Sequence, residues 1–436
     1  KPGIFNPKPT LVFGNLKEVI KRKEQFFQPY IDNYFKYKHL PYVGMYSFHQ
    51  PVLSIHDLEL AKHILIKDFD YFPSRGTYAG GVHDPLSANL FNLSGSRWKS
   101  LRLKMTPTHT PVKLKTMYPI IADVAKEALG YAEKLYASEQ AINFSEWYSM
   151  YAMELIGNVG FGFRCNSFNN SKSEFYIRGH EYFDHPSLYW RTIRALAFFA
   201  PELFDKLQIR RMSRNIEDFY YGIVTQTVEY RQKYNVRAND FLQTLIDVLG
   251  QITDPVGYSK DFPFTMDDVA ANTMLYLIAG YETSASAGQF AAYHLALNPH
   301  VQDKARLEVQ TVLTKYGGEF TYEAQNEMVY LNMQCPGLRT PLFRRCAKDY
   351  RVPDGSLVIE TGTMVFVPVQ AIHMDPDIFP EPDKFDPERF APENKAKLHP
   401  CHWMPFGEGP KKCLGKITYR GTMALFSLFS KEESRG

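Results

Sequence analysis

The segment from Thr265 to Asn298 restricts the possible folds of this chain more than any other. Thr265 with Asp268 three residues later is typical of a capping box, and Asn298 followed by Pro299 is a common stop signal for a helix. A helix over this segment would be roughly 50 Å long. Its first half is apolar on nearly every side, so we expect it to run through the interior of a large domain.

Segments with β character lie on both sides of this helical region. Residues 42–57 predict two short strands around a turn at Gln50-Pro51, and residues 356–369 predict further strands. Strands at the two ends of a chain do not form the repeating strand–helix–strand units of an open parallel sheet.

The long middle of the chain, between residues 98 and 335, carries mostly helical patterning. Nothing in it reads as a flexible linker, a repeat or a low-complexity tract. We therefore expect a mainly α fold with small β-sheets, built by residues 1–436 as a single large domain with a β-rich subregion.

Charge and cysteine content exclude several classes of protein. A net charge of +3 over 436 residues does not indicate a nucleic-acid partner. Five cysteines without a CxxC pair fit neither a disulfide framework nor a zinc site, and they suit a reducing, cytosol-facing environment. The N-terminal segment, with three prolines, is neither a signal peptide nor a membrane span, and no later apolar run is long enough to cross a bilayer. We expect a soluble or peripheral chain.

The segment Phe406–Gly415, FGEGPKKCLG, is the most informative for chemistry. Its glycines and proline predict a tight loop, and Cys413 then begins an apolar helical stretch. The free amides at a helix start stabilise a thiolate, and the two lysines before the cysteine favour it further. Gly407 and Gly409 would let backbone amides approach the sulfur. The alternative is a buried structural cysteine, which is the usual fate of an isolated thiol.

Four motifs in this order match those of one family. They are W-x-x-x-R at Trp98 and Arg102, A/G-G-x-D/E-T-T/S at Ala279–Ser284, P-E-R-F at Pro387–Phe390, and F-x-x-G-x-x-x-C-x-G at Phe406, Gly409, Cys413 and Gly415. The chain therefore resembles the cytochromes P-450, and it is most similar to the insect microsomal detoxification branch. The resemblance covers nearly the whole chain.

The resemblance implies haem b (iron protoporphyrin IX) with Cys413 as the iron ligand. A thiolate ligand pushes electron density toward iron and favours O–O cleavage. Thr283 would relay protons to dioxygen, with Glu282 as the donor on the solvent side. The alternative for this pair is a helix kink with an exposed carboxylate. The other residues that it places at the haem are Phe406, Gly407, Gly415, Ala279 and Gly280.

Haem carries two propionates, which need cationic partners when they are buried. The candidates are Arg102, Arg344 and Lys411, with Trp98 donating its indole N–H. Arg102 is the strongest, because Trp98 lies one helical turn away on the same face. The family usually has arginine in place of Lys411, and a lysine offers no bidentate fork, so anchoring there should be weaker.

The resemblance also implies partners and a location. Electrons would come from NADPH through NADPH–cytochrome P-450 reductase, with cytochrome b5 as a second candidate donor, at the cytosolic face of the endoplasmic reticulum membrane. We expect docking of the acidic reductase on a face near Cys413. The alternative is a solvated positive face. The lysines that could line this face are Lys99, Lys104, Lys411, Lys412 and Lys416.

The substrate would be an apolar small molecule, such as a plant toxin, an insecticide or an endogenous lipid. Its pocket walls could include Phe91, Leu93, the aromatic-rich stretch 182–204 and residues 365–369. The alternative is that these side chains are plain core.

One motif departs from the family pattern. The family's E-x-x-R should fall at residues 335–339, where the chain reads CPGLR, so the glutamate is missing and the proline and glycine would break the helix. In the family this glutamate belongs to a buried network with the arginines that correspond to Arg339 and Arg389. We expect its loss to leave buried charges uncompensated, at a cost of about 3–5 kcal/mol.

The two ends also differ from what the resemblance leads us to expect. No membrane anchor precedes the proline-rich start, and the chain stops at SKEESRG without the final β hairpin of its relatives. These differences favour an incomplete, misassembled or degenerate copy, or a genuine variant.

Three functions remain open from the sequence. A monooxygenase would insert one atom of O2 into an apolar substrate and release the other as water, and it alone needs Glu282, Thr283 and a reductase-binding face. A haem-thiolate isomerase or dehydratase would rearrange a peroxide without added electrons. A remnant with impaired haem binding would be consistent with the altered residues 335–339. We rank them in that order.

Overall fold

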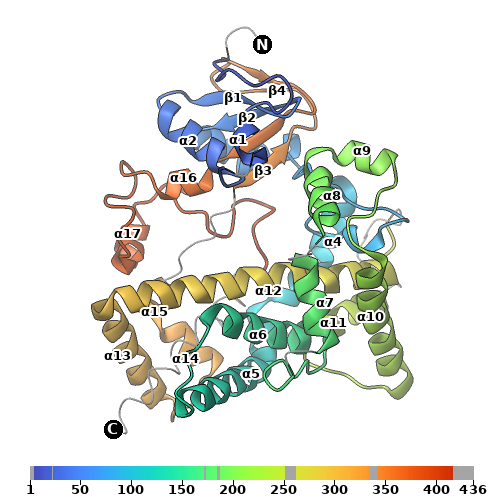
Figure 1. Ribbon diagram of the computed structural model, residues 1–436, viewed down its shortest axis with the longest axis vertical. Coiled ribbons are helices and arrows are strands. Elements are labelled where there is room, and N and C mark those ends of the chain that lie inside the picture. The colour runs from blue at the N-terminus through green and yellow to red at the C-terminus, as the bar shows by residue number, and fades with distance from the viewer. Residues whose placement is uncertain are drawn as a thin grey trace. The chain divides into compact units, whose positions relative to one another are not determined.

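The computed structural model describes residues 4–21, 23–170, 173–183, 187–250, 262–333 and 341–415. The chain forms two compact units. The first contains residues 1–77 and 337–413, and the second contains residues 78–336 and 414–436. The mainly helical fold with small sheets is confirmed (Figure 1). The single domain over the whole chain stays a prediction.

Both sheets belong to the first unit. The larger sheet has the order β1-β2-β6-β3, with β2 and β6 parallel and the other two pairs antiparallel. Segments from the two ends of the chain therefore share one sheet, as the blue and orange strands show (Figure 1). The strands are β1 (Tyr42–Ser47), β2 (Gln50–Ile55), β3 (Leu342–Arg345) and β6 (Met364–Val367), and β4 (Tyr350–Arg351) pairs with β5 (Val358–Ile359) in the smaller sheet.

The first hairpin turns two residues earlier than the sequence predicted. Ser47 pairs with Gln50, so the turn is Phe48-His49, and Phe48 has a φ of 55°. Gln50 and Pro51 begin β2 instead. Proline is tolerated there because the start of a strand needs no amide hydrogen from it.

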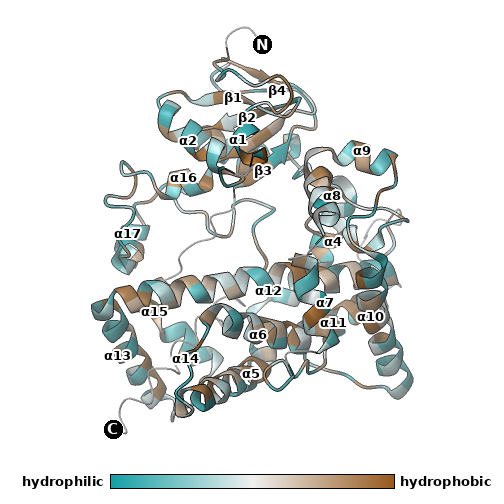
Figure 2. Ribbon diagram, in the orientation of Figure 1, coloured by the Kyte–Doolittle hydropathy of each residue, from teal (hydrophilic) through white to brown (hydrophobic). Residues whose placement is uncertain are grey.

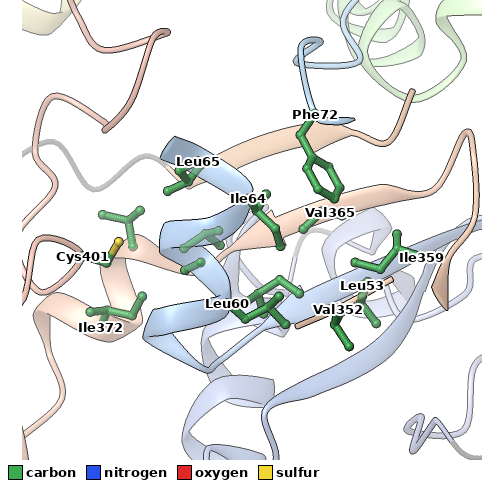
Figure 3. Packing of buried hydrophobic residues seen from close by; sticks show 14 of the residues in the cluster. Leu53, Leu60, Ile64, Leu65, Phe72, Val352, Ile359, Val365, Ile372 and Cys401 are labelled. Carbon is green, nitrogen blue, oxygen red and sulfur yellow. The ribbon is translucent and has the colours of Figure 1, made fainter. Parts of the chain in front are cut away.

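The core of the first unit is formed by β2, β6 and the helical segments after them (Figure 3). Val365, Val367 and Val369 all belong to this core and are at most 1% exposed. The expectation that residues 365–369 line a substrate pocket is therefore wrong, and they are core. The helical segments of this unit are α1 (Lys17–Ile20), α2 (Gln28–Tyr37), α3 (Leu58–Lys62), η1 (His63–Lys67), η2 (Phe69–Tyr71), α16 (Val369–His373), η6 (Pro387–Phe390) and α17 (Pro392–Lys395), the last mainly hydrophilic (Figure 2).

The second unit is mainly helical over its described residues, as the patterning between residues 98 and 335 predicted. The long helix α12 (Met266–Leu297) runs through this unit (Figure 1). The others are η3 (Pro85–Ser87), α4 (Gly95–Met105), η4 (Thr106–His109), α5 (Pro111–Ala137), α6 (Phe144–Ile156), η5 (Gly157–Phe161), α7 (Glu174–Phe183), α8 (Leu188–Phe199), α9 (Pro201–Lys206), α10 (Arg214–Tyr234), α11 (Phe241–Gly250), α13 (Pro299–Lys315), α14 (Tyr322–Glu327) and α15 (Val329–Met333).

Helix α12 begins and ends where the sequence predicted. Thr265 and Asp268 form the capping box, and Asn298 is the C-cap. Its glycines allow α6 to approach closely: a Cβ on Gly288 would lie 2.4 Å from the ring of Tyr148, and one on Gly280 would lie 2.4 Å from Ile156 Cδ1. Among the helices formed by the described residues, none combines the length and hydropathy that a bilayer span requires.

Candidate functional site

The loop that ends at Cys413 is closed by backbone hydrogen bonds within the first unit. The amide of Gly407 donates to Met404 O at 3.0 Å, and the amide of Cys413 donates to Phe406 O at 2.9 Å. The Cys413 side chain is exposed, whereas the other described cysteines, Cys165, Cys346 and Cys401, are buried. Cys413 is therefore not a structural core thiol.

The glycines of this loop have a conformational reason. Gly407 and Gly409 have φ angles of 69° and 75°, which favour glycine. A Cβ on Gly409 would lie 1.8 Å from Leu65 O, so no larger residue fits. The Gly407 amide donates to Met404 O, and the expected approach of backbone amides to the sulfur stays a prediction. Gly415 ends the described part of the loop, and the helix expected after Cys413 lies outside the described residues.

The two lysines before Cys413 do not form the expected positive face. Lys411 is only 3% exposed, and its carbonyl accepts a hydrogen bond from Arg75 at 2.9 Å. Lys412 Nζ lies 2.6 Å from Glu408 Oε1, which offsets its charge. Lysine is rarely buried unless it is paired, so the residue type alone predicts a position at the surface. The burial of Lys411 depends on tertiary packing, which the sequence does not show. Lys416 lies outside the described residues.

Arg344 in β3 is a buried cation that has no counter-ion among the described residues. It is 2% exposed, its Nη1 donates to Phe343 O at 2.7 Å, and its Nε has no hydrogen-bond partner in the part of the chain that the structure describes. Burial lowers the pKa of its guanidinium to about 10. In the described part of the chain it forms no ion pair, which is costly for a buried charge. An anionic group such as a haem propionate would satisfy it, so the residues present fit that cofactor.

Trp98 and Arg102 lie one turn apart on α4 in the second unit. Trp98 is 4% exposed and Arg102 is half-buried. The pKa of the nearby His109 is lowered to about 4, mainly by burial and in addition by the positive charge of Arg102. The prediction that both residues share one helix face is confirmed.

The side chains of the motif on α12 lie on two sides of the helix. Ala279 and Glu282 are exposed and Thr283 is half-buried, whereas Tyr281 is 2% exposed and contacts Phe183. The Thr283 hydroxyl donates to Ala279 O, and Glu282 Oε1 accepts from Ser286 Oγ at 3.4 Å.

The helix continues without a break in its assignment through this motif, and the choice between a proton relay and a kink stays open. The solvent-side position expected for Glu282 agrees with its exposure. Gly280 faces Ile156 of α6, which gives it a packing reason beside the predicted cofactor role.

Arg389 in η6 does not carry the uncompensated buried charge that the sequence led us to expect. It is half-buried and donates to the carbonyl groups of Pro380, Glu381 and Lys384, the last two at 2.6 and 3.4 Å. Its guanidinium therefore has acceptors without the missing glutamate. Arg339 and the rest of residues 335–339 lie outside the described residues.

Sequence reasoning missed Asn272 of α12, which is fully buried and accepts a hydrogen bond from Leu90 N at 3.0 Å. A lone amide within the apolar first half of the predicted helix was the signal for it, because a buried polar group needs a partner. Thus Phe406, Gly407, Lys411, Cys413 and Arg344 lie in the first unit, and Trp98, Arg102, Ala279, Gly280, Glu282 and Thr283 lie in the second.

Comparison with known proteins shows the family of this chain. A family model described as Cytochrome P450 matches residues 5–426. The chain is 37% identical to probable cytochrome P450 6a23 of Drosophila melanogaster, over 95% of this chain and 83% of that protein. It is 38% identical to cytochrome P450 6a8 of the same fly, over 93% and 82%, and 35% identical to cytochrome P450 6A1 of Musca domestica, over 95% and 82%. The chain therefore belongs to the cytochrome P450 family of haem-thiolate monooxygenases, whose members use haem b and draw electrons from NADPH through a reductase.

Proposed function

We propose that Cys413 is the haem ligand through which this monooxygenase acts on its apolar substrate. The observation that carries the proposal is the exposed thiol of Cys413 at the end of a loop that its own backbone closes. A haem with a thiolate ligand supplies the activation of dioxygen. The chain itself must hold that group, orient the substrate and deliver protons.

The cationic residues would hold the propionates. Arg344 is the main anchor in this proposal, because it is buried without a carboxylate among the described residues. Arg102 and the indole N–H of Trp98 would serve from α4, and Lys411 would add a point charge. A charge-assisted hydrogen bond to a propionate would offset the cost of burying each cation.

Glu282 and Thr283 would deliver protons. The exposed carboxylate of Glu282 can exchange protons with solvent, and Ser286 already donates a hydrogen bond to it. Thr283, the next residue, donates its hydroxyl to Ala279 O, from which it can turn to pass a proton onward. Both roles are proton transfers over hydrogen-bond distances.

The redox partner in this proposal is NADPH–cytochrome P-450 reductase, with cytochrome b5 as a second electron donor, at the cytosolic face of the endoplasmic reticulum. The exposed Lys99 remains a candidate contact for an acidic partner. Leu11 and Val12 of the first unit are exposed at 103% and 64%, which suits apposition to a membrane. The role in this proposal is detoxification of apolar foreign compounds, as the resemblance to the insect microsomal branch implies.

The first test is the reduced carbon-monoxide difference spectrum of the purified chain. A strongly red-shifted Soret band would support thiolate ligation, and a band typical of histidine-ligated haem would contradict it. The second test adds reductase and NADPH with 7-ethoxycoumarin as an apolar probe. NADPH-dependent formation of the dealkylated product supports the monooxygenase, whereas conversion of an added lipid hydroperoxide without NADPH would favour an isomerase.

A further inference from the structure

A buried asparagine joins helix α12 to the loop before α4 in the second unit. Asn272 is 0% exposed, its Oδ1 accepts from Leu90 N at 3.0 Å, and its Nδ2 donates to Asp268 O at 2.7 Å. Both ends of the amide are thus occupied. A backbone amide of a loop, which would otherwise be buried without a partner, is held by one side chain of the long helix.

The loop itself is rigid, so one attachment orients all of it. Asn89 Nδ2 donates to Leu86 O at 3.1 Å, and its Oδ1 accepts from the amides of Phe91 and Asn92 at 3.2 and 3.3 Å. Asn92 Nδ2 donates to Ser87 O at 2.9 Å. Residues 86–92 therefore form one hydrogen-bonded turn, from which the Phe91 side chain projects with 47% of its surface exposed.

A second attachment lies one helical turn away. Asp268 Oδ1 accepts from Arg97 Nη2 of α4 at 3.3 Å, and Asp268 Oδ2 accepts from Thr265 N at 2.9 Å. Asp268 and Asn272 are four residues apart on one face of α12. Together they hold both the loop and the first turn of α4 against the start of α12.

We infer that Asn272 is a positioning residue for the haem and substrate site. Residues seven apart on a helix lie on nearly the same side, so Ala279 follows Asn272 two turns later, about 10 Å along the axis. The loop covers this side at Asn272, and the same side is exposed at Ala279. The bond to Leu90 thus sets where Phe91, and after it Trp98 and Arg102 on α4, lie relative to Ala279 and Thr283. This inference rests on the proposed function.

The test separates positioning from mere stability by comparing two ligands of different size on the haem-containing protein. Imidazole needs access to the iron alone, whereas 4-phenylimidazole also contacts the walls around it. Asn272→Leu removes both hydrogen bonds at similar volume. We expect it to weaken binding of 4-phenylimidazole about tenfold while imidazole binding changes less than about twofold. Asn272→Asp keeps the acceptor for Leu90 N and should restore most of the difference.

Thr273→Val is the matched control. Thr273 is the next residue, is also 0% exposed, and its hydroxyl has no hydrogen-bond partner among the residues that the structure describes. It should leave the ratio of the two affinities unchanged. An equal loss of both affinities in Asn272→Leu, or no change in their ratio, would overturn the positioning role.

Amide hydrogen exchange reports the same attachment without any ligand. The Leu90 amide should exchange faster in Asn272→Leu than in the wild type, and the increase should be smaller in Asn272→Asp. In Thr273→Val its exchange rate should not change. Equal exchange in all variants would show that the bond does not hold the loop. A wild-type protein without the red-shifted carbon-monoxide band would refute the proposed function, whereas a normal band with an unchanged affinity ratio would refute only the role of Asn272.

Discussion

The assignment of Cys413 can be tested at the scale of one sulfur atom. Cys413→Ser should abolish the red-shifted carbon-monoxide band and leave the far-ultraviolet circular dichroism spectrum unchanged, because the side chain is exposed and fills no core. The matched control is Cys401→Ser, which puts a hydroxyl into the core at a position with 0% exposure. The control should lower stability by about 1–3 kcal/mol and keep the band. The opposite pattern would exclude Cys413 as the ligand.

Arg344 provides a second prediction at this scale, with two effects of opposite sign. In Arg344→Met, the protein without haem should gain about 1–4 kcal/mol of stability, because a buried charge that lacks an ion pair in the described structure is removed. The same variant should retain haem less well, because a propionate would lose its partner. Urea unfolding of the haem-free protein and haem transfer to an acceptor protein measure the two effects.

Arg231→Met is the contrasting control for that prediction. Arg231 is also buried, but its Nη1 lies 2.9 Å from Asp240 Oδ1, so its removal leaves a buried carboxylate without a counter-ion. We expect a loss of about 3–5 kcal/mol there. If both variants were destabilised alike, Arg344 would have a partner other than haem.

At the scale of elements, the packing of α6 on α12 predicts unequal costs for two glycines. In Gly288→Ala the new methyl group meets the ring of Tyr148, which is fully buried and cannot turn away. We expect a loss of about 1–3 kcal/mol in urea unfolding. In Gly280→Ala the methyl group meets Ile156 Cδ1, the flexible end of a side chain, so the loss should be smaller. Equal costs would mean that Gly280 is needed for more than packing.

The elements also show why some features could be predicted from the sequence. The ends of α12 depend on Thr265, Asp268 and Asn298, which act within a few residues, and these ends were correct. The parallel pairing of β2 with β6 joins segments about 300 residues apart and has no local signal. The first turn was misplaced because proline commonly marks a turn, whereas Phe48 turns with a positive φ that its residue type does not favour.

The same distinction applies to the candidate site. Motif spacing selected Cys413, Trp98, Arg102 and Thr283 as candidates, and it does not show what each side chain contacts. Burial of Lys411 and the bond from Asn272 to Leu90 depend on residues far away in the chain. Such contacts follow from tertiary packing, which a single sequence does not specify.

At the scale of the whole molecule, a buried histidine in the first unit, His56, and a half-buried histidine in the second, His109, predict that stability falls as the pH is lowered. Burial lowers the pKa of His56 and of His109 from 6.5 to about 4. Both rings are therefore neutral in the folded state over a range in which the unfolded chain binds protons. Stability that is present above pH 6.5 is lost as the pH falls toward 4, by up to about 1.4 kcal/mol per pH unit for each ring.

His109→Phe tests how much of this pH-dependent loss of stability comes from one of the two rings. The ring of His109 stacks on Phe241 at a centroid distance of 4.7 Å, so phenylalanine can keep the aromatic contact but cannot take up a proton. Urea unfolding at pH 7.5 and at pH 5 should show a smaller difference in the variant than in the wild type, by about 1–2 kcal/mol. An unaltered difference in His109→Phe would mean that the His109 ring of the wild type takes up a proton as readily in the folded protein as in the unfolded chain. In that case α4 and its neighbours tolerate the charge.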